Sequence, residues 1–371
     1  MVNRVQNQYA PDYVSPPGET LLETLETIGM SQADLAERTG KAIKTINEIV
    51  QGKAPITPET ALQFERVLGV PARFWNNREQ RYREFLAQAG ERERLQTHVG
   101  WLKQAPVKPM CQLGWIRCLA DEIEQLREVL QFFGVATPDQ WRAIWLSPQA
   151  SFRRSPAFEA DPVAVAAWLR RGEFEAQRLP CEAYDAVRFR AVLAEVRQLT
   201  QQPPEVFQAE LVRLCATAGV AVVFVPELPK MHVSGATRWL TPTKALIQLS
   251  LRYKSDDHLW FTFFHEAGHI VQHGKREFFI DFDDRDGDDK EQAADKFAAD
   301  CLIPAPQWRR FARQTRYSKE QILAFATDAG IAPGIVVGRL QHDKLLPPSH
   351  CNDLKRRLDW ASDAVAVVAR S

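Results

Sequence analysis

The spacing of hydrophobic positions predicts a series of short helices at the start of the chain. Residues 1–17 are polar, and an apolar stripe with three- and four-residue spacing then runs from Leu21 to Ile28. Four more helices are expected before residue 87, and their start or stop signals are the cap Ser31, the terminating Gly40 and Gly52, the pair Thr57-Pro58, and Pro71.

The pattern changes in the second half of the chain. Residues 87–200 keep helical stripes and contain no chemical motif, which predicts a helical spacer or packing region. The apolar run 220–225 predicts a buried strand, and the alternation over 245–252 predicts a half-buried one. Helices are then expected around residues 257–273, from about 289 to 302, and again after Ser318.

These elements predict a multidomain protein that is mainly α, with a small α+β part. The expected parts are a flexible N-terminus (1–18), a five-helix domain (19–94), a helical middle region (95–200), an α+β domain (201–310) and a C-terminal helical region (311–371).

Composition and charge limit what the chain can do. Its 371 residues are 45% hydrophobic and 25% charged, which is typical of a globular protein that buries its own core. The 47 basic and 47 acidic residues cancel, so nucleic-acid binding requires a local surface. The chain has neither an N-terminal signal pattern nor an apolar run of membrane-spanning length. Six scattered cysteines without a CxxC pair predict reduced thiols in the cytoplasm, with no membrane partner.

A candidate metal site lies in His265-Glu266-Ala267-Gly268-His269. Two histidines four residues apart on a helix point to one side, so both imidazoles can bind one metal ion. Glu266 is then placed to act as general base toward a water on that ion. A catalytic zinc needs a third protein ligand, and Glu291 on the next predicted helix is the candidate. Asp295, one turn later, can accept the other N–H of a liganding histidine.

Alternatives to this interpretation exist. The two histidines can instead be satisfied core groups, and His273 competes with Glu291 for the position of third ligand. The acidic cluster from Asp281 to Asp289 lacks the ligand spacing of a calcium loop, because Phe282 stands at the first position and Ala293 at the last. It is therefore interpreted as a solvated loop.

The helices predicted near 31–39 and 42–51 have helix-turn-helix spacing, and the second is the recognition helix. Its candidate base contacts are Ile43, Lys44, Thr45 and Asn47, and the candidate phosphate contacts are Gln32 and Lys53. Residues 20–70 carry five basic and seven acidic groups, a net charge of −2, which predicts weak nonspecific DNA affinity. A small helical bundle that binds protein is the alternative.

Both ends of the chain resemble known families. Residues 19–70, with Ser31-Gln-Ala-Asp-Leu-Ala-Glu-Arg-Thr-Gly40, resemble the Cro/C1-type (XRE) regulators, especially the HigA-like antitoxins. Residues 232–304, with the His265–His269 motif and Glu291-Gln-Ala-Ala-Asp295, resemble the ImmA/IrrE metallopeptidases, which implies a zincin-like fold. The resemblance implies zinc ligands at His265, His269 and Glu291 and a catalytic base at Glu266. Asp295 stands where many relatives have Asn.

The resemblance also implies a function. Members of the ImmA/IrrE family cleave repressors or other regulatory proteins. We therefore expect a DNA-binding transcriptional regulator that acts as a homodimer and has a zinc-dependent endopeptidase domain. The alternative is a HigA-like antitoxin or repressor that binds DNA and a partner toxin while its peptidase fold is inactive. The intact His265–His269 motif together with Glu291 favours the enzyme.

Overall fold

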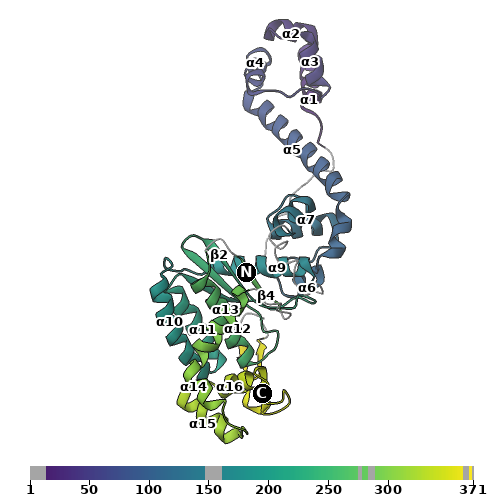
Figure 1. The fold of residues 1–371 in the computed structure, drawn as a ribbon. Helices are drawn as coiled ribbons and strands as arrows, with labels where there is room; N and C mark the ends of the chain where they lie inside the picture. The colour runs from purple at the N-terminus through teal and green to yellow at the C-terminus, as the bar shows by residue number, and fades with distance from the viewer. Residues whose placement is uncertain (1–13, 147–160, 275–277, 283–288, 362–366, 370–371) are drawn as a thin grey trace, which may run out of the picture. The chain divides into compact units, whose positions relative to one another are not determined.

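The computed structural model describes residues 14–146, 161–274, 278–282, 289–361 and 367–369 (Figure 1). The chain divides into two compact units, with the boundary between His98 and Val99. Within the described residues, no single helix is long and apolar enough to cross a membrane. The pair 319–329 and 333–342, bent by 114°, passes that test by length and composition only.

The N-terminal unit is built of helices, as the sequence predicts. Its five helices are α1 (Pro17–Ile28), α2 (Gln32–Thr39), α3 (Ile43–Val50), α4 (Pro58–Leu68) and α5 (Ala72–Gln96). Local signals set their ends: the Ser31 and Thr57 side chains accept backbone hydrogen bonds at the starts of α2 and α4, and Gly40 ends α2 in the left-handed region. Leu21, Leu35, Ile46, Phe64 and Trp75 form the centre of its core.

The second unit contains the sheet and the remaining helices. Helices before the sheet are α6 (Val107–Gln112), α7 (Glu122–Phe133), α8 (Pro138–Trp141), α9 (Pro162–Arg178), α10 (Ala186–Gln198) and α11 (Pro204–Ala216). The strands are β1 (Val220–Phe224), β2 (Val233–Thr241), β3 (Lys244–Leu249) and β4 (Phe279–Phe282), with a separate pair β5 (Leu358–Trp360) and β6 (Val367–Ala369). Later helices are α12 (Asp256–Gln272), α13 (Asp289–Leu302), α14 (Ala305–Phe311), α15 (Lys319–Ala329) and α16 (Pro333–His342).

The four-stranded sheet has the order β1-β3-β2-β4 and is mixed. β1 and β3 are parallel, whereas β2 runs antiparallel to both β3 and β4, which leaves β4 at one edge. Alternate residues of the strands face opposite layers. Val220, Val222 and Phe224 join the core that includes α10, α11 and α12, while Ala221 and Val223 pack with α9. α9 and α10 come from the predicted middle region, so that region supplies the helix on one face of the sheet and part of the core on the other.

β3 differs from its prediction as a half-buried strand. Leu246 and Gln248 are each only 1% exposed, so both faces of the strand are covered. The polar residue that suggested a solvent face is held inside the protein, where the side-chain Nε2 of Gln248 donates a hydrogen bond to the carbonyl of Trp168 on α9 at 2.7 Å. Because this polar side chain is accommodated inside the protein, a fully buried strand has the alternation of polar and apolar residues that is typical of a half-buried one.

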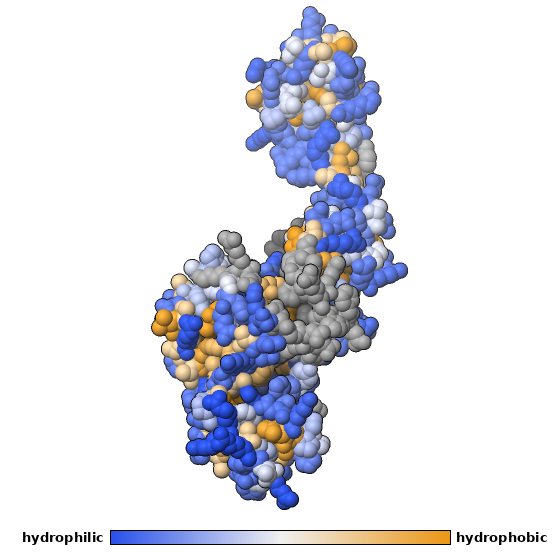
Figure 2. Space-filling model, viewed as in Figure 1, coloured by the Kyte–Doolittle hydropathy of each residue, from blue (hydrophilic) through white to orange (hydrophobic). Residues whose placement is uncertain are grey.

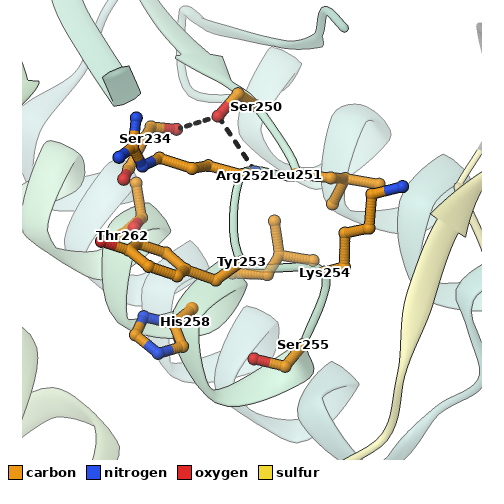
Figure 3. Close-up of a pocket in the computed structure, with 10 residues that line it drawn as sticks. Ser234, Ser250, Leu251, Arg252, Tyr253, Lys254, Ser255, His258 and Thr262 are labelled. Carbon is orange, nitrogen blue, oxygen red and sulfur yellow. Dashed lines mark hydrogen bonds between the residues drawn. The ribbon is translucent and has the colours of Figure 1, made fainter. Parts of the chain in front are cut away.

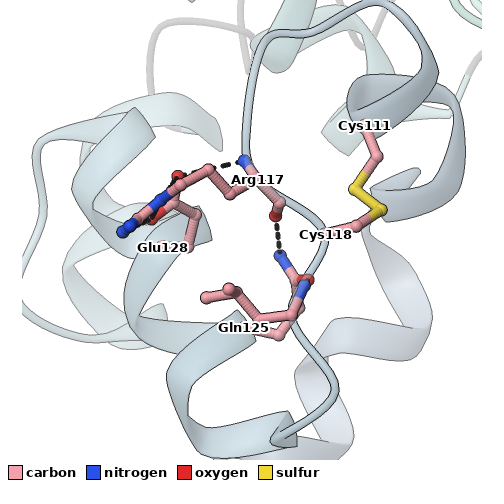
Figure 4. The surroundings of a disulfide bond; sticks show 6 residues. Cys111, Arg117, Cys118, Gln125 and Glu128 are labelled. Carbon is pink, nitrogen blue, oxygen red and sulfur yellow. Dashed lines mark hydrogen bonds and ion pairs between the residues drawn. A yellow bond between two sulfur atoms is a disulfide. The ribbon is translucent and has the colours of Figure 1, made fainter. Parts of the chain in front are cut away.

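Two cysteines depart from the expectation of reduced thiols. Cys111, in α6, and Cys118 are joined by a disulfide, with their Cα atoms 5.6 Å apart (Figure 4). Arg117 beside this bond forms an ion pair with Glu128 on α7 at 2.7 Å, and the Arg117 carbonyl accepts a hydrogen bond from Gln125. The other four cysteines, Cys181, Cys215, Cys301 and Cys351, are free thiols, as expected.

Candidate metal centre

Helix α12 carries the two candidate histidines into the interior of the second unit. Asp256 and Asp257 stand in its first turn, where carboxylates interact favourably with the positive end of the helix dipole. Trp260, Phe263 and Phe264 are fully buried and fix the helix against the sheet and its neighbours. This burial extends through the motif, since His265 is 0% and His269 2% exposed.

Three side chains from two helices converge beside the sheet. The Nε2 atoms of His265 and His269 lie 3.0 Å apart. Glu291, in the first turn of α13, places one carboxylate oxygen 3.0 Å from Nε2 of His265 and the other 3.4 Å from Nε2 of His269. Potential ligand atoms of these three residues all lie within 4.8 Å of one another.

The donor set fits a zinc ion. Asp295 Oδ1 lies 2.9 Å from Nδ1 of His265, so a neutral His265 carries its proton on Nδ1 and directs the lone pair of Nε2 into the cluster. Ligand atoms about 2.0–2.1 Å from one tetrahedral zinc lie about 3.3 Å from each other. The separations within the cluster of His265, His269 and Glu291, 3.0 to 3.4 Å, agree with that spacing.

His273 lies on the other side of His269. It is the residue directly after α12, and its Nδ1 is 3.1 Å from Nδ1 of His269, the nitrogen opposite to the cluster. Phe279 on β4 stacks on the His269 ring, with centroids 3.9 Å apart. Of the two side chains that compete for the position of third ligand, the structure therefore brings Glu291 to the cluster and leaves His273 behind His269.

The electrostatics of the cluster of His265, His269 and Glu291 favour the binding of a cation. Burial lowers the pKa of His265, but its hydrogen bonds to Asp295 and Glu291 outweigh burial and raise it to about 10. Burial lowers the pKa of His269. Although burial acts against it, hydrogen bonds from both histidines hold the pKa of Glu291 below its usual range. Carboxylates thus concentrate negative charge where a cation would lie.

Glu266 faces the sheet from the same helix. Its side chain is fully buried, and burial raises its pKa to about 8. The Thr237 hydroxyl on β2 donates a hydrogen bond to the backbone carbonyl of Glu266 at 3.1 Å, which ties this turn of α12 to the strand. Its two carboxylate oxygens are buried and have no hydrogen-bond partner among the described residues, and the nearby His265 interacts with them electrostatically.

The candidate recognition helix is α3 in the N-terminal unit. Ile46 and Ile49 are buried in the core, whereas Ile43, Lys44 and Asn47 are exposed on the outer side. Thr45 and Gln32 are half-buried, and Lys53 is exposed just after the helix. On the face shown in Figure 2, polar residues cover most of this unit, with apolar groups among them. Ile43, 51% exposed, is one of several exposed apolar side chains of the unit, together with Ile28, Leu62 and Phe74.

Comparison with known proteins covers both units. Residues 21–75 match the helix-turn-helix family model, and residues 215–341 match the model of the IrrE N-terminal-like domain, a peptidase family. The chain joins a helix-turn-helix domain to an IrrE N-terminal-like domain. Among solved structures, it is similar to an addiction module antidote protein of a HigA family from Coxiella burnetii, with 27% identity over 23% of this chain and 94% of that one and a TM-score of 0.21. No curated protein matches the chain.

The IrrE N-terminal-like domain also contains residues at the centre that the sequence did not reveal. Gly235 on β2 passes against Glu266, so close that an added Cβ would lie 2.7 Å from Oε1 of Glu266. Asp281 was interpreted as part of a solvated loop. That interpretation is wrong, because Asp281 is 4% exposed and pairs with Gly235 across β4 and β2. Asp289 begins α13, and the acidic residues at 283, 284, 286 and 288 lie outside the described residues.

The missed residues share one cause. β2 and β4 were not predicted from the sequence, because they form neither a long apolar run nor a regular alternation, and in the structure both strands contact α12. Gly235 belongs to no sequence motif, and only the pairing of β2 with β4 brings it opposite Asp281.

Proposed function

We propose that this protein is a DNA-binding transcriptional regulator whose IrrE N-terminal-like domain is a zinc-dependent endopeptidase acting on a repressor or another regulatory protein. The main support is the convergence of His265, His269 and Glu291, whose ligand atoms have the spacing of a three-ligand zinc site. In this proposal those three residues bind zinc.

Each residue of the centre then has a separate task. A bound zinc ion would polarise the substrate carbonyl and lower the pKa of water. Glu266 receives the proton of the attacking water on a carboxylate oxygen and passes it to the leaving amine nitrogen, as general base and then general acid. Asp295 keeps Nδ1 of His265 protonated and the ring oriented. Gly235 lets β2 approach Glu266 closely enough to exclude water around the carboxylate.

The helix-turn-helix domain supplies the DNA contacts in this proposal. Lys44 and Asn47 on α3 are exposed and of the types that bond base edges and phosphates, while Ile43 and Thr45 suit contacts with a thymine methyl. Gln32 and Lys53 flank the helix at positions that suit phosphate contacts. A homodimer would present two such helices to a palindromic operator.

A substrate trap tests the enzymatic part. The full chain with Glu266→Gln is expected to bind one zinc per chain and to retain its protein substrate during purification from the native host. Wild-type protein should cut that captured protein, and the variant should cut it about 10²–10⁴-fold more slowly, the usual contribution of a general base. If wild-type protein loaded with zinc left the captured protein intact, the antitoxin-like alternative would replace this proposal.

A further inference from the structure

A cavity between three helices lies behind the candidate metal centre. It has a volume of about 490 Å³ and is lined by residues of α12, α13 and α16 together with Lys355. This volume falls in the range of small-molecule sites, ~300–1,000 Å³. His258 also lines a second hollow, where it stacks on Tyr253 with ring centroids 4.1 Å apart (Figure 3). That hollow, about 10 Å³, has room for about one water molecule, so of the two only the first can take an organic ligand.

The first of these hollows, here called the three-helix cavity, has an apolar floor. Leu302 and Ile303 from α13 and Ile335 from α16 are buried beneath it, and Phe261 and Ala299 add further carbon surface. Its polar lining residues include exposed groups such as Lys296 and Asp300 on α13. A molecule in the cavity therefore meets mainly carbon on the inside and charged groups at the mouth.

The charges of the lining cancel. Equal numbers of basic and acidic side chains take part, namely Lys296, Arg339 and Lys355 against Asp257, Asp295 and Asp300. Lys355 is paired with Asp257 at 2.6 Å, and Arg339 is paired with Asp343 at 3.1 Å. A charged ligand would lose its hydration without meeting a surplus of opposite charge, which is unfavourable. The lining thus suits an uncharged molecule.

Two residues of the lining contact a candidate zinc ligand. Asp295 Oδ1 lies 2.9 Å from Nδ1 of His265, and the Phe261 ring lies 6.4 Å from the His265 ring between centroids. The Asp295 side chain is 35% exposed, so a molecule in the cavity would cover a carboxylate that water otherwise reaches. A hydrogen bond shielded from water is electrostatically stronger, and a stronger bond at Nδ1 makes the imidazole a more basic metal ligand.

We propose that the three-helix cavity binds an uncharged, largely apolar small molecule, and that this ligand strengthens zinc binding through its contacts with Asp295 and Phe261. The binding site goes beyond the proposed peptidase function, whereas the coupling rests on the proposed zinc ligand His265. Because Asp295 contacts Nδ1, the cavity lies on the side of His265 opposite to the Nε2 atom that faces the metal cluster. The ligand therefore regulates the centre without occupying the position of the substrate.

Dye binding to the full chain tests the site. The probe is N-phenyl-1-naphthylamine, an uncharged dye whose fluorescence rises in apolar surroundings. One dye per chain should bind saturably, at least about 10-fold more tightly than 1-anilinonaphthalene-8-sulfonate, which adds a sulfonate to the same rings. Ala299→Trp fills the cavity and should abolish this binding, and the smaller Ala299→Leu should weaken it. Ala324→Trp, at an exposed alanine of α15 outside the lining, is the matched control and should bind the dye like the wild type.

The coupling is measured by repeating the titration with zinc. Saturating dye should raise the zinc affinity, measured against a chelating indicator, by at least about 5-fold, and zinc should tighten dye binding by the same factor because coupling between two sites is reciprocal. Equal binding of the dye and its sulfonate, or unchanged dye binding in Ala299→Trp, would overturn the ligand site. A zinc affinity that stays constant or falls would overturn the coupling. Dye binding is measured without zinc or turnover, so its failure and failure of the peptidase are separate outcomes.

Discussion

Gly235 and Glu266 lie so close together that no side chain can replace the hydrogen of the glycine without displacing the carboxylate. A Cβ at position 235 would stand 2.7 Å from Oε1 of Glu266 and 2.9 Å from its Cγ. The contact joins β2 to α12 at the residue that the proposed chemistry depends on. It also explains why a small residue occurs in the middle of a sheet strand, where glycine ordinarily weakens the structure.

Gly235→Ala is therefore expected to impair cleavage more than folding. Overpacking of this kind usually costs about 1–3 kcal/mol of stability, and here the displaced group is Glu266 itself. Thermal unfolding should show a lower Tm, zinc content should remain at one per chain, and cutting of the captured substrate should fall sharply. Gly100→Ala is the control, since nothing lies within 4 Å of an added Cβ there. Wild-type cleavage by Gly235→Ala would contradict this account.

The third ligand can be decided by metal analysis. Glu291→Ala should lose most of its zinc, because its two carboxylate oxygens lie 3.0 and 3.4 Å from the histidine Nε2 atoms. His273→Ala should retain zinc, because His273 contacts the opposite nitrogen of His269. Zinc per chain is measured by elemental mass spectrometry after exhaustive dialysis. The reverse pattern of stoichiometries would remove Glu291 from the proposed ligand set.

Asp295 should tune metal affinity without binding the metal. Its carboxylate orients His265 through Nδ1 at 2.9 Å, and loss of such a partner typically weakens metal binding about 10–100-fold. Asp295→Ala should show this loss in competition with a chelating indicator. Asp295→Asn should recover much of it, since the amide oxygen still accepts the N–H. Asp300→Ala, an exposed position on the same helix, should bind zinc like the wild type.

The helix-turn-helix domain should bind a palindromic operator as a dimer, with half-sites separated by about one helical turn, ~34 Å. Lys44→Ala combined with Asn47→Ala should remove specific protection in footprinting while zinc content and Tm stay unchanged. Both side chains are exposed on α3, so their removal takes nothing from the core. Unchanged protection by the double variant would mean that α3 is not the recognition helix.

The helices were predictable because their signals are local. Ser31 and Thr57 cap α2 and α4 through hydrogen bonds that span three residues, and Gly40 ends α2 through its own backbone conformation. The same holds for the α12 motif, where two histidines four residues apart necessarily share a side of the helix. The expected helix from about 289 to 302 coincides with α13, which brings Glu291 and Asp295 to the histidines.

The sheet was harder to predict because distant parts of the chain bury its polar residues. Gln248 suggested a solvent face, yet its amide bonds the Trp168 carbonyl, 80 residues earlier in the chain. Asp281 suggested a solvated loop, yet the pairing of β4 with β2 buries it opposite Gly235. Neither contact leaves a periodic pattern in the sequence.

Because α9 packs on one face of the sheet, it determines which truncated forms of the chain keep that face buried. Trp168 and Leu169 are buried against Ala221 and Val223 of β1 and Leu246 of β3. A fragment that begins at residue 201 contains the whole metal cluster but lacks α9, so it would present this apolar sheet face to water and aggregate. A fragment that begins at Val99, the start of the second compact unit, keeps the face covered. Recombinant work on the metal centre should therefore include about one hundred residues that contribute no ligand to it.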